Sequence, residues 1–110
     1  EGPLFFFFFE QFQQALAHTH ANPKALIIRL AHVPFVDFTA LHSLELVIQR
    51  LSKQQVTVLL CEANATVNQK LQKAGILDLI GSSHHFETFD EVLNYCELRY
   101  EHQSKFLLHS

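Results

Sequence analysis

Apolar residues along the chain form two kinds of pattern, short continuous runs and stripes with helical spacing. The runs, each interrupted by at most one polar residue, cover residues 4–8, 25–30, 56–61 and 76–80. Runs of this kind are typical of strands that are buried on both faces of a sheet. We therefore predict four strands, of which residues 76–80 form a short edge strand.

After each run, apolar residues recur at the spacing expected on one face of a helix. Stripes of this kind lie in residues 9–20, 41–53, 64–74 and 88–98. Asn64 is placed to cap the third of these helices, and Gly75 is placed to end it. Thr88 and Glu91 match a capping box at the start of the fourth helix. We therefore predict one helix after each strand.

The predicted order of elements is βαβαβαβα. Strands that alternate with helices through short loops indicate a mainly parallel sheet with right-handed crossovers. The expected fold class is therefore α/β, a small and mainly parallel β-sheet with alternating helices. With 110 residues, 48% of them hydrophobic, the chain can form one core. We predict a single domain over residues 1–98 and a helical extension or frayed tail over residues 99–110.

Composition and charge exclude several partners. A formal net charge of −3 leaves no basic excess with which to bind nucleic acid. No apolar stretch approaches the roughly 18 residues needed to cross a bilayer. The two cysteines, Cys61 and Cys96, have no CxxC spacing and lie in apolar segments, so we expect both to be buried.

The sequence also carries no recognisable catalytic motif. It contains no GxGxxG, Walker, nucleophile-elbow or HExxH pattern. The eight histidines include two close pairs, His18 with His20 and His84 with His85, without a cysteine or carboxylate at ligand spacing. We therefore expect no enzyme activity, no cofactor and no metal, and we expect the chain to regulate or bind another molecule.

Five consecutive phenylalanines near the start of the chain form an unusual segment. Consecutive side chains point in different directions in a strand or a helix, so one buried face cannot cover them all. We expect most of the rings to be buried and at least one to face solvent or a partner. The candidate docking surface consists of Phe5, Phe6, Phe7, Phe8 and Phe9.

The turn before the longest helix holds the candidate regulatory residues. In a parallel sheet such turns lie at the carboxyl edge of the strands, where ligands bind. Asp37 or Thr39 can cap the helix that follows. A phosphate on Thr39 would lie at the positive end of the helix dipole, and the alternative is that both residues form an ordinary cap. The candidate anion- or partner-binding rim also includes Val36, Phe38, Ala40 and Asn64.

Three stretches of the chain, in residues 2–6, 33–41 and 56–76, occur in the order expected for the STAS domain family and resemble it. Residues 33–41, Val-Pro-Phe-Val-Asp-Phe-Thr-Ala-Leu, resemble its signature turn. Residues 2–6, Gly-Pro-Leu-Phe-Phe, resemble the strand that opens this domain in SulP anion transporters. Residues 56–60 and 71–76 resemble its third strand and the helix that follows. The likeness extends from Gly2 to about Tyr95.

The resemblance implies one of two roles. STAS domains occur as the cytoplasmic part of SulP-family transporters of sulfate and related anions. They also occur as free-standing anti-sigma-factor antagonists, in which a kinase modifies a hydroxyl that maps onto Thr39, with the preceding acid at Asp37. The antagonists usually have serine in place of Thr39 and glycine in place of Ala40, and both departures weaken the phospho-switch interpretation. The Gly-Pro-Leu-Phe-Phe opening and the abrupt start of the chain favour the transporter branch instead.

Our first hypothesis is therefore the cytoplasmic regulatory domain of an inner- or plasma-membrane anion transporter. Its partner is expected to be the transmembrane domain of the same transporter or a cytosolic regulatory protein. The chain contains no methionine and starts abruptly at Glu1, so we expect it to be part of a longer polypeptide. One alternative is a soluble, antagonist-like signalling module with Thr39 as phospho-acceptor. Another is a small domain that binds an anion or nucleotide at the helix N-termini near Thr39 and Asn64.

Overall fold

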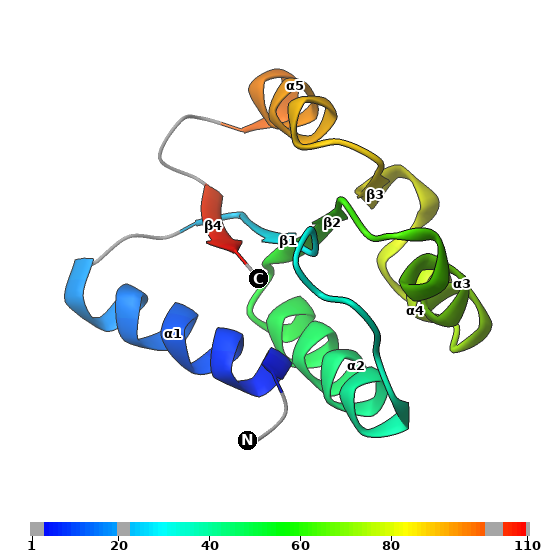
Figure 1. Ribbon diagram of the computed structural model, residues 1–110. Helices are drawn as coiled ribbons and strands as arrows, with labels where there is room; N and C mark the ends of the chain where they lie inside the picture. Colours follow the sequence, from blue (N-terminus) through cyan, green and yellow to red (C-terminus); the bar gives the residue numbers. More distant parts are fainter. Residues whose placement is uncertain (1–3, 20–22, 101–104, 110) are drawn as a thin grey trace.

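The computed structural model describes residues 4–19, 23–100 and 105–109 (Figure 1). The elements in chain order are α1 (Leu4–Thr19), β1 (Ala25–Arg29), α2 (Phe38–Lys53), β2 (Thr57–Cys61), α3 (Ala65–Lys73), α4 (Ile76–Ile80), the 3-10 helix η1 (Ser82–His84), β3 (His85–Phe86), α5 (Phe89–Arg99) and β4 (Lys105–His109). The strands form one sheet in the order β3-β2-β1-β4, and every pair is parallel. The predicted α/β class with a parallel sheet is confirmed. In the described part of the chain, no helix is long and apolar enough to span a membrane.

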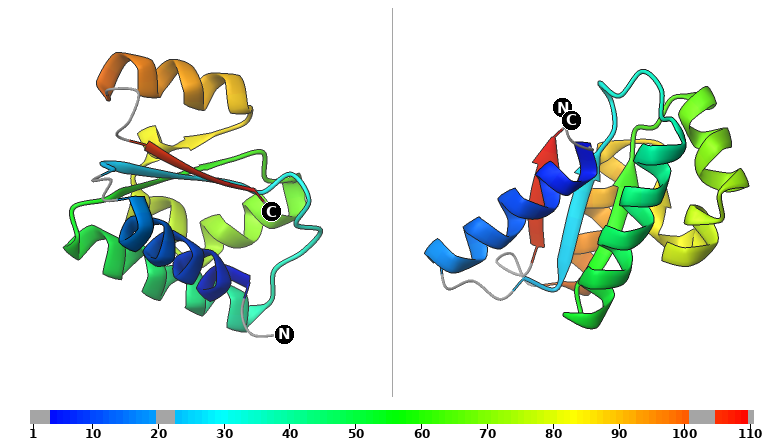
Figure 2. Two further views of the ribbon diagram at one scale, coloured as in Figure 1. Left: turned by 90° about the vertical axis from the view of Figure 1, so that its left-hand side faces the viewer. Right: turned by 90° about the horizontal axis from the view of Figure 1, so that it is seen from below.

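Helices cover both faces of the sheet. Figure 2 shows α5 on one face and α1, α2, α3 and α4 on the other. Alternate residues of β1 enter different cores: Leu26 and Ile28 pack with the larger helical layer, whereas Ala25 and Ile27 pack under α5. Positions that are buried on both faces must be apolar, which is why residues 25–28 form a continuous apolar run.

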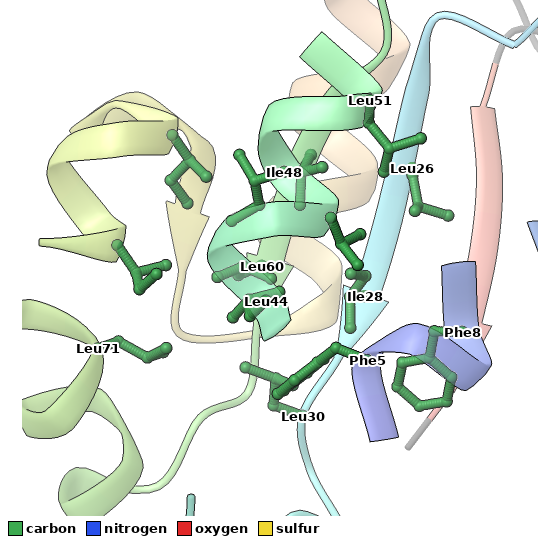
Figure 3. Close-up of a cluster of buried hydrophobic side chains, with 14 of the residues drawn as sticks. Phe5, Phe8, Leu26, Ile28, Leu30, Leu44, Ile48, Leu51, Leu60 and Leu71 are labelled. Atoms are coloured by element: carbon green, nitrogen blue, oxygen red, sulfur yellow. The ribbon is translucent and has the colours of Figure 1, made fainter. Parts of the chain in front are cut away.

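The larger core is built around α2. Its buried side chains are Ser43, Leu44, Val47, Ile48 and Leu51. Figure 3 shows Leu44, Ile48 and Leu51 on the side of α2 that faces β1 and β2. The hydroxyl of Ser43, the polar member of this stripe, donates to the carbonyl of Ala40 at 2.9 Å, so it is not left without a partner in the core.

The strand predicted over residues 4–8 is wrong, because these residues form the start of α1. Phe5, Phe8 and Phe12 lie one helical turn apart and are buried, whereas Phe7 is 55% exposed. In a strand, residues 5 and 7 would instead share one face. Five identical aromatic residues fit either periodicity, so the run alone could not distinguish a strand from a helix.

The edge strand predicted over residues 76–80 is also wrong. These residues form α4, which buries Ile76 and Ile80, four residues apart, and exposes Leu79. Gly75 adopts a left-handed conformation with φ of 79°, which ends α3 and turns the chain into α4. The edge of the sheet is formed by β3, whose two residues pair with Leu60 and Cys61.

The tail after Arg99 differs from the predicted helical or frayed extension. Residues 105–109 form β4, which pairs in parallel with all five residues of β1. Strand β1 would otherwise be an edge strand with unpaired backbone groups, and β4 supplies their hydrogen-bond partners. Residues 105–109 therefore belong to the same sheet as the rest of the described chain.

The helical assignment of the phenylalanine run can be tested with two matched substitutions. Phe8→Ala should lower the free energy of unfolding by about 3–5 kcal/mol, because it removes a buried ring. Phe7→Ala should lower it by about 1 kcal/mol or less, because that ring is mostly exposed. Both values can be measured by urea denaturation. Equal losses for the two variants would contradict the burial pattern of α1.

Candidate functional site

The candidate site lies at the carboxyl edge of β1 and β2, as the parallel order of the strands predicts. The segment that follows β1 runs along this edge and leads into α2 (Figure 1). Its path begins with the amide of Leu30, which donates to the carbonyl of Cys61 at 2.9 Å. Val33 and Val36 are buried in the larger core. The loop is therefore packed onto the domain at two points, and the residues between and after them are presented to solvent.

Asn64 fixes this loop to the start of α3. Its side-chain oxygen accepts the amide of Val67 at 2.8 Å, which confirms the predicted cap. Its side-chain nitrogen donates to the carbonyls of Val33, at 3.4 Å, and Pro34, at 3.2 Å. One side chain therefore joins the loops that follow β1 and β2. Asn64 is placed among the candidate rim residues by the sequence, but these contacts with the other loop could not be predicted from it.

Arg29, the last residue of β1, and Glu62, directly after β2, form an ion pair. Arg29 Nε and one terminal nitrogen donate to the two carboxylate oxygens of Glu62, at 2.6 and 2.9 Å. Glu62 has a φ of 70°, in the left-handed region that side chains rarely adopt. Its amide donates to the carbonyl of Phe86, and the Arg29 guanidinium lies 3.9 Å from the ring centre of Phe89. Contacts from β1 and β3 thus hold the strained residue in place, and α5 packs against its partner Arg29.

Hydrogen bonding with Glu62 raises the pKa of Arg29 above its usual value. Burial, with the negative charge of Glu62, raises the pKa of the Cys61 thiol to about 12. Cys61 is therefore a neutral thiol at physiological pH and a poor nucleophile. Cys61 and Cys96 are both buried and free, in agreement with the predicted burial.

Asp37 caps α2. Its side-chain oxygen accepts the amide of Ala40 at 2.8 Å, and its carbonyl accepts the amide of Leu41 at 3.0 Å. Of the two alternatives for this cap, the structure thus selects Asp37. Thr39 is the second residue of the helix and is exposed. Ala40, the next residue, is half-buried.

The candidate rim is more apolar at its surface than the sequence indicates. Phe38 is 82% exposed, and Phe35, in the same turn, is 69% exposed. Val36, predicted as a rim residue, is a core residue instead, because its side chain packs into the larger cluster. Residues 33–38, Val-Pro-Phe-Val-Asp-Phe, contain one valine and one phenylalanine in each group of three residues. This repeat was the available signal for the arrangement.

A groove of about 350 Å³ lies beside this rim. It is lined by Phe38, Leu41, His42 and Glu45 of α2 and by Lys70, Lys73 and Ala74 at the end of α3. The rings of Phe38 and His42 are parallel, with centres 6.2 Å apart. Sequence reasoning missed this groove. Its α2 wall follows helical spacing, but the residues opposite depend on how two helices pack.

The phenylalanine run mainly builds the core. Phe5 and Phe8 are buried, and Phe6 and Phe9 are half-buried, each with its ring centre 5.8 Å from the Arg50 guanidinium carbon. Of the predicted docking surface, the side chain that is mostly exposed is Phe7. The run therefore offers a partner one ring rather than five.

The histidines that the structure describes do not converge on a metal site. His84 Nδ1 lies 2.6 Å from the carbonyl of Ile80, and Nε2 lies 2.9 Å from the Tyr95 hydroxyl. Burial lowers the pKa of His85. Among the described residues, no three His, Cys, Asp or Glu side chains form a group that could hold a metal ion. His20 lies outside the described residues.

Comparison with known proteins gives a consistent result. The family model of the STAS domain matches residues 1–92 of the chain. YvdB of Bacillus subtilis (strain 168), a proposed sulfate transporter, is 28% identical over 93 residues, which are 84% of this chain and 18% of YvdB. The chain thus spans about a fifth of the length of this curated relative.

Two solved structures are also similar. The STAS domain of a SulP transporter from Vibrio cholerae is 38% identical, with a TM-score of 0.73, and the match covers 90% of this chain and 80% of that one. A sulfate transporter family protein from Wolinella succinogenes is 26% identical, with a TM-score of 0.72, covering 89% and 80%.

The two roles of Asn64 can be separated by mutation. Asn64→Asp keeps the oxygen that caps α3 but loses the N–H groups that hold the preceding loop. We expect the amide signals of residues 33–38 to shift in the ¹H–¹⁵N correlation spectrum while α3 stays folded. Asn64→Ala should lose the cap as well, with an additional loss of about 1 kcal/mol in urea unfolding. Shifts no larger than those of the exposed control Asn94→Asp would refute the role of Asn64 in holding the loop.

Proposed function

The chain belongs to the STAS domain family, and we propose that it is the cytoplasmic regulatory domain of a SulP-type anion transporter. The observation that carries this proposal is the 38% identity with the STAS domain of the Vibrio cholerae SulP transporter, over 90% of this chain. In this role the chain does not carry the anion. It docks onto the transmembrane part of the same transporter or onto a cytosolic protein.

The chemistry of the rim supports binding rather than catalysis. Arg29 and Glu62 are paired with each other, Asp37 is engaged in the cap of α2, and Cys61 is a neutral thiol. The large apolar groups that face solvent nearby are the rings of Phe35 and Phe38. Exposed aromatic side chains on a fixed scaffold are typical anchors of protein interfaces. We therefore propose that the rim recognises a partner and performs no reaction.

Docking regulates transport if the domain binds one conformation of the transporter more tightly than another. A tenfold difference in affinity shifts the conformational equilibrium by about 1.4 kcal/mol. A rim that is fixed before binding loses little conformational entropy when it docks, so more of the contact energy is available for this difference. The loop packed against the core and the ion pair of Arg29 with Glu62 fix the rim in this way before binding.

A second candidate function rests on the exposure of Thr39. Because Asp37 caps α2, the Thr39 hydroxyl is not needed for that purpose and is open to a kinase. Phosphorylation would add a charge of about −1.5 to −2 at the rim, close to the Asp37 carboxylate. In a free-standing signalling module this change would switch partner binding.

The proposal is tested on the complete gene product that contains this chain. We expect a reading frame with several membrane-spanning segments and uptake of radiolabelled sulfate or another small inorganic anion into vesicles. Thr39→Glu should change the uptake rate several-fold without lowering the melting temperature of the 110-residue chain. The control Thr39→Ser should leave the uptake rate unchanged. A short frame without membrane-spanning segments would overturn the transporter assignment, and phosphorylation of Thr39 by a kinase would then favour the signalling module.

A further inference from the structure

We propose that the groove between α2 and α3 binds an acidic amphipathic helix of a protein partner, with Phe38 as its apolar anchor. This inference rests on the proposed function of the domain in docking and names the surface and the chemistry of the partner. Three properties of the groove lead to it: its apolar anchor, its charge and its shape.

The apolar part of the groove begins with Phe38. Its ring is 82% exposed and lies parallel to that of His42, one turn further along α2. Leu41 and Ala74 continue the apolar lining between the two helices. A large aromatic side chain that stands at the mouth of a groove with apolar lining gains from being covered. The partner must therefore present apolar side chains to this region.

The charge of the groove comes from α3. Lys70 and Lys73 both line it and lie on the last turn of the helix. Among the described residues, neither lysine takes part in an ion pair, whereas Glu45 on the opposite wall lies 4.0 Å from His42. Two lysines three residues apart share one side of a helix. Carboxylates one turn apart on a second helix would match their spacing, and complementary charge of this kind fixes the register of a complex.

The shape of the groove favours a helix over a membrane. Its α2 wall extends from Phe38 to Glu45, about two helical turns, and a third helix can lie between two packed helices in this way. A groove bounded by two helices fits the rod shape of a third helix better than the flat surface of a bilayer. The chain also has a formal net charge of −3, which opposes binding to an anionic leaflet. An acidic helix satisfies the apolar, charged and geometric requirements together.

The test places a photo-crosslinker at the anchor. Phe38→p-benzoylphenylalanine is introduced into the complete gene product in its own cells, and the crosslinked peptide is identified by mass spectrometry after irradiation. We expect the crosslink to lie in a segment with at least two Asp or Glu residues and with apolar residues three or four positions apart. Lys70→Glu with Lys73→Glu should lower the crosslink yield at least tenfold, whereas the control Lys53→Glu, at the far end of α2, should not.

A charge exchange completes the test. Replacing the acidic residues of the crosslinked segment with lysine should restore the yield of the doubly substituted variant. A crosslink to lipid, to a second copy of this chain or to a segment without acidic residues would overturn the inference, as would no crosslink or a yield insensitive to Lys70 and Lys73. The result is independent of the transporter assignment. A crosslink to an acidic helix of a soluble partner would support the proposed role of the groove, whereas the reading frame tests the proposed function.

Discussion

Burial of the central strands on both faces is the constraint on which the rest of this structure depends. Alternate residues of β1 and β2 pack into two separate cores, one under α2 and one under α5. The positions buried on both faces must then be apolar, and parallel strands must be joined by crossovers through helices. These crossovers bring the loops that follow β1 and β2 to the same edge. The candidate site is therefore a consequence of how the core is closed.

The stiffness of that edge follows from the same packing. Arg29 is the last residue of β1 and Glu62 directly follows β2; the two form an ion pair, and the Arg29 guanidinium also lies over the ring of Phe89 in α5. Asn64 then connects the loop after β1 to α3 through hydrogen bonds, and this held loop leads directly to Phe38. A surface prepared in this way is suited to recognition, because little order has to be gained on binding.

The sequence predicts the parts of the fold in which one period dominates. Residues 25–30 and 56–61 are apolar runs of strand length, and α2, α3 and α5 have clear stripes with capping residues. Five identical rings and the pair Ile76 and Ile80 fit a strand or a helix, and tertiary packing decides between them. The pairing of residues 105–109 depends on which edge of the sheet is open. For the site, the predicted ends of the strands are enough to locate Asp37, Phe38, Thr39 and Asn64. The groove could not be predicted, because it depends on the position of one helix relative to another.

The central claim is that the rim, together with the groove between α2 and the end of α3, forms the surface by which this domain binds its partner. Hydrogen exchange measured by mass spectrometry, on the complete gene product and on the 110-residue chain alone, tests it most directly. Slower exchange of residues 35–45 and 70–74 in the complete protein, with no change in residues 94–98 of α5, is the result we predict. Protection of α5 with none at the rim would contradict the claim.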